Sequence, residues 1–154
     1  MNEFIESIGF LQEGPFAIPR WEALFSNIDV LWQGALVTLL VASLGLVMAL
    51  VLGIAFGVMS TSHWRVPRAF ARAYVEFYQN TPLLIQVFML FNAIPLLITG
   101  LFIPVIVIGI IGVGMYHGAY IAEVVRAGIQ SIGRGQLEAA LSQGFTYIGA
   151  MRHI

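Results

Sequence analysis

The chain has 154 residues, of which 59% are hydrophobic and 10% are charged, and its mean hydropathy is +0.89. Soluble domains carry about 25% charged residues, so this composition indicates an integral membrane protein and little else fits. The formal net charge of −1 gives no support for nucleic-acid binding. The sequence has no cysteine, which excludes disulfides and cysteine-based metal or redox sites.

Residues 1–29 form an acidic lead-in ahead of the apolar part of the chain. They carry five carboxylates against one cation, Arg20, and they contain turn formers at Gly14, Pro15 and Pro19. We expect an extracytoplasmic, partly amphipathic segment that lies near the membrane surface and does not span it.

Residues 30–62 contain no acidic or basic side chain. Because roughly twenty helical residues cross the hydrocarbon core, this run predicts one long span at about 31–59. Small residues recur within it at steps of four, which places them on one face where another helix can approach closely. These residues are Gly45, Ala49, Gly53 and Gly57.

The strongest positive cluster follows this span. Arg65, Arg68 and Arg72 lie close together with Pro67 between them, and cytoplasmic loops of membrane proteins carry such an excess of arginine. The cluster therefore predicts a cytoplasmic location for this segment and an N-terminus outside. A short helical piece is expected over 66–78.

Residues 77–122 are again free of acidic and basic side chains and are long enough for two spans. Thr81 precedes Pro82, and a residue before proline avoids the α region. We expect a helix break here, with Thr81 as N-cap and Pro82 as the first helical residue. The second span is then about 82–97, the outer turn 98–100 and the third span about 102–125, with Gly114 and Gly118 at GxxxG spacing.

Several polar residues lie at membrane depth, where they must be paired or face water. Tyr116, Tyr120 and Glu123 share one helical face that could contact a zwitterionic substrate. Glu123 lies near the cytoplasmic boundary and could pair with Arg126 at i+3, which favours a structural or gating role. Gln86 and Asn92 are also candidates for the substrate path or its gating, but interhelical hydrogen bonding is the favoured interpretation for both of them and for His117.

The C-terminal segment 135–154 has a distinctive spacing. Glu138, Ala139 and Ala140 are followed by Gly144 and, ten residues later, by Ile154. Residues 136–143 are good helix formers, Gly144 supplies a turn, and a second short helix is expected over 147–154. Two short helices at an angle form a knob that can dock into a groove on a partner.

This spacing is that of the EAA loop, and two further segments point the same way. Residues 73–86 (AYVEFYQNTPLLIQ) and 118–132 (GAYIAEVVRAGIQSI) resemble the second- and third-helix signatures of polar amino acid importers. The chain, over about 34–154, therefore resembles a permease subunit of type I ABC importers, in the histidine, glutamine and arginine branch.

The resemblance implies an all-α membrane fold of five spans, of which 30–154 would hold three, so that the chain is expected to be C-terminally truncated. It implies a multi-pass protein of the bacterial inner membrane that carries polar amino acids of the glutamine, glutamate, arginine, histidine and cystine class. The expected partners are a second permease subunit, an extracytoplasmic solute-binding protein and two ATPases, which hold the ATP and Mg. This chain itself would have no catalytic residue, metal or cofactor, and would couple to the ATPases through Glu138, Ala139, Ala140, Gly144 and Ile154.

Three alternatives remain at this point. A truncated remnant would not transport. A self-sufficient secondary transporter usually shows internal repeats and mid-membrane ionisable residues, and the sequence shows neither. A membrane enzyme is disfavoured because the Gly-x-Ser-x-Gly motif, the HExxH motif and paired intramembrane aspartates are missing from this sequence.

Overall fold

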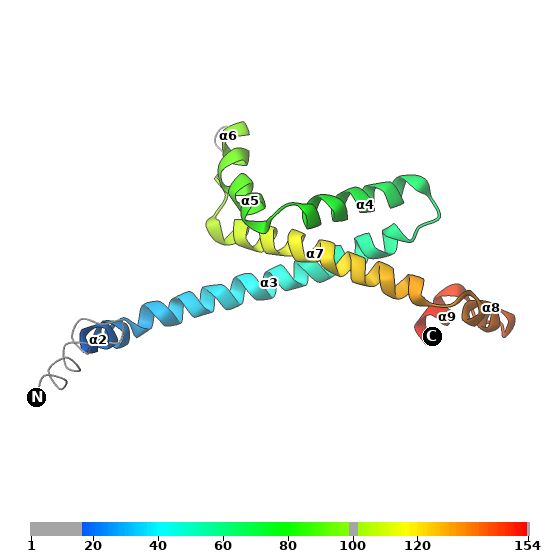
Figure 1. Ribbon diagram of the computed structural model, residues 1–154, viewed down its shortest axis with the longest axis horizontal. Coiled ribbons are helices and arrows are strands. Elements are labelled where there is room, and N and C mark those ends of the chain that lie inside the picture. Colours follow the sequence, from blue (N-terminus) through cyan, green and yellow to red (C-terminus); the bar gives the residue numbers. More distant parts are fainter. Residues whose placement is uncertain (1–16, 99–101, 154) are drawn as a thin grey trace, which may run out of the picture. The chain divides into compact units, whose positions relative to one another are not determined.

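The computed structural model describes residues 17–98 and 102–153, and every regular element within these ranges is a helix (Figure 1). This confirms the predicted all-α class. Our expectations for residues 1–16, for most of the outer turn 98–100 and for Ile154 fall outside the described residues. The chain divides into two compact units, 1–40 and 41–154.

The first unit contains α2 (Ile18–Ser26) and the beginning of α3 (Ile28–Ser60). Pro19 lies in the first turn of α2, where its missing N–H would have no helical partner. The Asn27 side chain donates to the Ala23 carbonyl at 2.7 Å, and this bond closes the end of α2. Helix α3 starts at Ile28, three residues before the predicted start of the span at about residue 31.

Within the described ranges, two helices are long and apolar enough to cross a membrane: α3, with 33 residues, and α7 (Val105–Ser131), with 27. Helix α7 begins after the predicted residue 102 because Pro104 occupies its N-cap. It also continues six residues beyond the predicted end at 125, so the segment around Arg126 is helical.

Within the second unit, α3 packs on α7 through small residues. Gly45, Ala49, Gly53 and Gly57 are all buried. A Cβ placed on Gly53 would lie 2.5 Å from Ile121 Cβ, and one on Gly57 would lie 2.6 Å from Val125 Cβ. On the α7 side, a Cβ on Gly114 would lie 2.8 Å from Met48 Cγ. The missing side chains therefore let the two backbones approach closely.

The segment between α3 and α7 is bent. It contains α4 (Arg65–Asn80), α5 (Leu83–Phe88), the π-helical turn η1 (Met89–Ala93) and α6 (Ile94–Leu97). Helix α4 and the piece Leu83–Leu97 meet at 101°, so the pair is a broken span or a re-entrant segment. In Figure 1, α4 and α7 lie side by side, while α5 and α6 turn away from α4.

Two details of this bend differ from the sequence prediction. The predicted cap was wrong by one residue: Pro82 is the N-cap, helix α5 starts at Leu83, and the cap makes no side-chain hydrogen bond. The predicted second span is also not one regular helix. Pro95 has no N–H and its ring would crowd the carbonyl four residues earlier. The preceding turn widens instead, and the Ile94 N–H bonds to the Met89 carbonyl.

Candidate functional site

Tyrosine side chains fix α4 against the middle of α7. The Tyr74 hydroxyl donates to the Met115 carbonyl at 2.7 Å, and the Tyr78 hydroxyl lies 3.2 Å from Met115 Sδ. The Phe56 ring of α3 stacks on Tyr74 with centroids 4.0 Å apart. A Cβ on Gly118 would lie 2.8 Å from the Tyr74 hydroxyl, so this glycine makes room for the cross-helix bond.

A polar pocket of about 320 Å³ lies where the end of α3, α4 and α7 meet. It contains side chains of both charges and one buried hydroxyl group. Its lining residues are Ser60, Arg72, Val75, Glu76, Gln79, Glu123 and Arg126.

Of the four charged side chains that line this pocket, Arg126 and Glu123 are hydrogen-bonded to each other, whereas Arg72 and Glu76 are not. Arg126 Nε donates to Glu123 Oε2 at 2.9 Å, and Arg126 also bonds to the second oxygen of Glu123 and to Gln130 Oε1. Among the described residues, the Arg72 guanidinium and the Glu76 carboxylate form no ion pair or side-chain hydrogen bond. In the part of the chain that the structure describes, this cation and this anion thus have no direct side-chain partner within the pocket.

The sequence indicated only part of this pocket. The i, i+3 spacing pointed to Glu123 and Arg126, which are paired. Arg72, Glu76 and Gln79 were missed, although their spacing of four and then three places them on one face of α4. The sequence analysis used Arg72 only as evidence for membrane topology, and Glu76 and Gln79 only as part of the 73–86 signature.

The tyrosine face of α7 lies elsewhere. The Tyr116 and Tyr120 hydroxyls are 3.1 Å apart, but neither residue lines the polar pocket with Glu123. His117 Nδ1 lies 3.1 Å from the Val113 carbonyl, and Asn92 donates to the Phe88 carbonyl at 3.1 Å. Both bonds are made within their own helical segments and not between helices.

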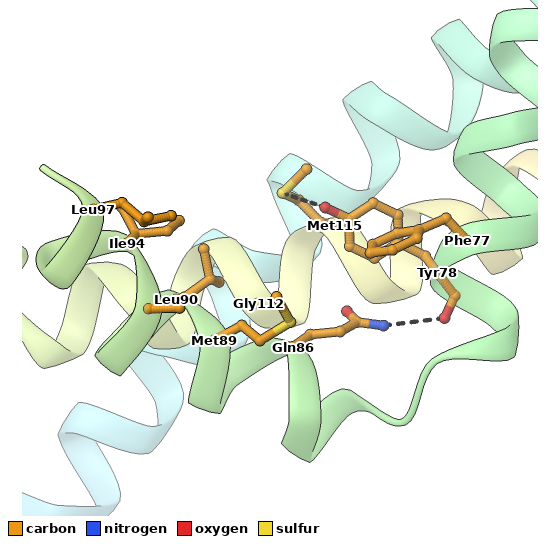
Figure 2. A pocket seen from close by; sticks show the side chains of 10 residues that line it. Phe77, Tyr78, Gln86, Met89, Leu90, Ile94, Leu97, Gly112 and Met115 are labelled. Atoms are coloured by element: carbon orange, nitrogen blue, oxygen red, sulfur yellow. Dashed lines mark hydrogen bonds between the residues drawn. The ribbon is translucent and has the colours of Figure 1, made fainter.

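Gln86 closes the break between α4 and α5. Its Nε2 donates to the carbonyls of Tyr78, at 3.1 Å, and Thr81, at 2.8 Å. Figure 2 shows the amide beside a largely apolar cavity of about 190 Å³ that Met89, Leu90 and Met115 help to line. Two carbonyls that the bend would otherwise leave unpaired are thereby satisfied, which gives Gln86 a structural role.

The EAA segment folds into two short helices, α8 (Arg134–Ser142) and α9 (Tyr147–His153). Gly144 between them has φ +88°, a conformation that favours glycine. The Gly144 N–H bonds to the Leu141 carbonyl at 3.0 Å, and the Phe145 N–H bonds to the Ala140 carbonyl at 3.1 Å. These bonds form a tight turn after α8.

The α8–α9 pair has an exposed, grooved surface. Glu138 and Ala139 are exposed, and a groove of about 230 Å³ runs between α8 and α9, lined mainly by alanines, Gln143, Phe145 and His153. No group of histidine, aspartate and glutamate side chains that could hold a metal ion occurs among the described residues.

Comparison with known proteins places this arrangement in a family. Residues 49–154 match the binding-protein-dependent transport system inner membrane component family. The chain belongs to this family. Its membership confirms the expected ABC permease class and a place in the bacterial inner membrane.

Relatives of the chain agree with this membership. The probable glutamine ABC transporter permease protein GlnM of Bacillus subtilis (strain 168) is 40% identical over 131 residues, which cover 85% of this chain and 60% of the relative. The putative glutamine transport system permease protein GlnP of Rickettsia prowazekii (strain Madrid E) is 37% identical over 116 residues, covering 75% and 53%. The chain thus spans about 60% or less of the length of these curated relatives.

A solved structure supports the fold. The crystal structure of an amino acid ABC transporter with histidines superposes with a TM-score of 0.75 and 30% sequence identity. The match covers 85% of this chain and 60% of that chain. The helical arrangement described above is therefore similar to that part of the solved transporter, which agrees with an ABC type I permease fold.

Proposed function

We propose that this chain acts as a permease subunit of an ATP-driven importer of polar amino acids, and that α8 and α9 couple it to the ATPases. The observation that carries the proposal is the turn at Gly144, which presents the exposed Glu138 and Ala139 on a short helix. The glutamine and amino acid transport names of the relatives support the substrate class.

The arginines support a topology with the N-terminus outside. Apart from Arg20, every arginine lies in a segment that the proposal places in the cytoplasm or at its boundary: Arg65, Arg68, Arg72, Arg126, Arg134 and Arg152. This asymmetry follows the positive-inside rule. On this basis we propose that α8 and α9 lie on the side where ATP is available, and that the bent α4–α6 segment forms the second of three spans.

The proposed mechanism is a two-state rocking of the transmembrane helices. A solute-binding protein delivers the amino acid on the outside, and two permease subunits form the pathway. The ATPases, which hold ATP and Mg, draw the coupling helices together when they close. Nucleotide and loaded binding protein each favour one of the two states, which is sufficient to drive alternation.

Substituting Ala139 tests the coupling surface. If this alanine permits close approach of an ATPase, Ala139→Trp should weaken ATPase association by about 1–3 kcal/mol, or roughly 5- to 150-fold. The measurement is the amount of ATPase that copurifies with the tagged permease in the complete importer, together with ATP-dependent uptake. Ala139→Ser is the matched control and should behave as wild type, because it adds only one atom.

Normal copurification and uptake with the tryptophan variant would refute the coupling role. Uptake that persists without ATP and collapses with the proton gradient would instead favour a secondary transporter.

We further propose that the polar pocket contacts the amino acid in transit, with Arg72 facing its carboxylate and Glu76 facing its ammonium group. Loss of one charge-assisted hydrogen bond costs about 1.5–3 kcal/mol. Arg72→Gln and Glu76→Gln should therefore each raise the KM for uptake roughly 10- to 150-fold. The melting temperature should barely change, because both side chains are exposed and unpaired among the described residues.

Arg20→Gln, which removes a charge outside the pocket, is the control and should leave the KM unchanged. Uptake kinetics across glutamine, glutamate, arginine, histidine and cystine provide the measurement. An unchanged KM in both pocket variants would remove the pocket from the pathway.

A further inference from the structure

The corner between α3 and α4 carries a cationic and aromatic surface. Helix α3 ends at Ser60 and α4 begins at Arg65, so this corner lies where the chain leaves the apolar span. Arg65 and Arg68 are both exposed, and no carboxylate in the described part of the chain lies within 4 Å of either. Trp64 between the two helices is 78% exposed.

The first two turns of α4 also expose an apolar face. Val66 is 81% exposed and Phe70 is 64% exposed, and their i, i+4 spacing places them on one side of the helix. Because successive residues of an α-helix are rotated by about 100°, Arg65 and Arg68 lie on nearly the opposite side of α4 from Val66 and Phe70. An amphipathic helix with one cationic and one apolar face is suited to the boundary between lipid headgroups and acyl chains, and exposed tryptophan is enriched at the same depth.

A pocket at this corner provides room for a polar headgroup. Its volume is about 500 Å³, and Ser62, His63, Trp64 and Tyr147 are among the residues that line it. Ser62 Oγ accepts from the Trp64 N–H at 3.2 Å, and its own hydroxyl proton can still be donated. The pocket thus combines hydrogen-bonding groups with aromatic walls, and one of its lining residues, Trp64, directly precedes Arg65 in the chain.

From this arrangement we infer that the α3–α4 corner binds the headgroup of an anionic phospholipid. Arg65 and Arg68 pair with the phosphate, the pocket beside Trp64 receives the headgroup hydroxyls, and Val66 and Phe70 contact the acyl chains. Charge complementarity identifies the occupant, because a helix with two guanidinium groups on one face and an apolar opposite face matches a lipid whose phosphate lies above its hydrocarbon chains. The inference does not depend on the transport activity proposed above.

The test is a titration of the purified, detergent-solubilised chain with fluorescent phosphatidylglycerol, competed by unlabelled phosphatidylglycerol or phosphatidylcholine. We expect phosphatidylglycerol to compete and phosphatidylcholine to compete poorly. An arginine near a lipid phosphate contributes about fivefold in affinity, so the Arg65→Gln/Arg68→Gln double variant should bind roughly 25-fold more weakly. Arg20→Gln removes one positive charge elsewhere in the chain; it is compared with Arg65→Gln alone and should bind as wild type.

Three outcomes would contradict the proposed lipid binding at this corner. Equal competition by the two lipids would overturn the inference without use of any variant, so misfolding of a variant cannot obscure it. Equal weakening by Arg20→Gln would show an unspecific charge effect. Wild-type lipid binding by the double variant, combined with loss of ATPase copurification in the complete importer, would assign the surface to a protein partner.

Discussion

Replacing Gly53 with leucine should lower the melting temperature of the purified chain by about 3–12 °C, which corresponds to about 1–3 kcal/mol of overpacking. A Cβ built on Gly53 would lie 2.5 Å from Ile121 Cβ and 3.2 Å from the Gly118 carbonyl oxygen. Real Cβ atoms do not tolerate the first distance, so α3 and α7 must move apart. Thermal unfolding in detergent, followed by size-exclusion chromatography, measures the loss.

Gly34→Leu is the matched control for this prediction. It makes the same substitution in the same helix, but nothing lies within 4 Å of a Cβ built on Gly34. Its melting temperature should stay near that of the wild type, and leucine is a better helix former than glycine. Equal melting temperatures for the Gly53 and Gly34 variants would show that the small-residue face does not hold α3 to α7.

Replacing Gly144 with valine should reduce ATP-driven uptake by the complete importer roughly 5- to 30-fold. The residue has φ +88°, and the left-handed region costs a residue with a Cβ about 1–2 kcal/mol. Nothing lies within 4 Å of a Cβ built on Gly144, so the penalty comes from the backbone and not from a clash. The turn that positions α8 against α9 would then be populated far less often.

Gly144→Asn separates backbone strain from the loss of glycine itself. Asparagine enters the left-handed region more readily than most residues with a side chain, so this variant should keep uptake within about twofold of wild type. Rates of radiolabelled amino acid uptake, normalised to the permease present in the membrane, give the comparison. Equal defects in the two variants would contradict a role for the left-handed turn.

The long elements of this fold follow from local sequence. Uncharged runs predicted α3 and α7 to within a few residues at most ends, and the glycine and alanine spacing gave the face on which Gly53 and Gly57 lie. The 101° bend between α4 and the piece Leu83–Leu97 could not be predicted from local sequence, because the angle depends on packing between segments. A Cβ on Gly112 would lie 2.8 Å from Val87 Cγ2, so α7 must lack a side chain there to admit α5. No local pattern reveals this contact.

The polar pocket was predictable only where its residues lie on one helix. Glu123 and Arg126 lie one turn apart, and their pairing follows from the i, i+3 rule. Arg72 and Glu76 line the same pocket from α4, and the sequence of neither segment predicts that α4 and α7 meet there. The bond between Tyr74 and the Met115 carbonyl is what brings them together, across forty-one positions of sequence.

Helix α7 continues without a break from the middle of the second unit to Ser131, and α8 starts at Arg134. Glu123 therefore lies eight residues, or about 12 Å, before the end of the same rigid rod. Ile132 and Gly133, which separate α7 from α8, have extended backbone conformations, so a movement of α8 can be absorbed at this junction before it reaches α7. If α8 and α9 bind an ATPase as proposed, the conformation of these two residues, together with the stiffness of α7, determines how much of the ATP-driven movement reaches the polar pocket.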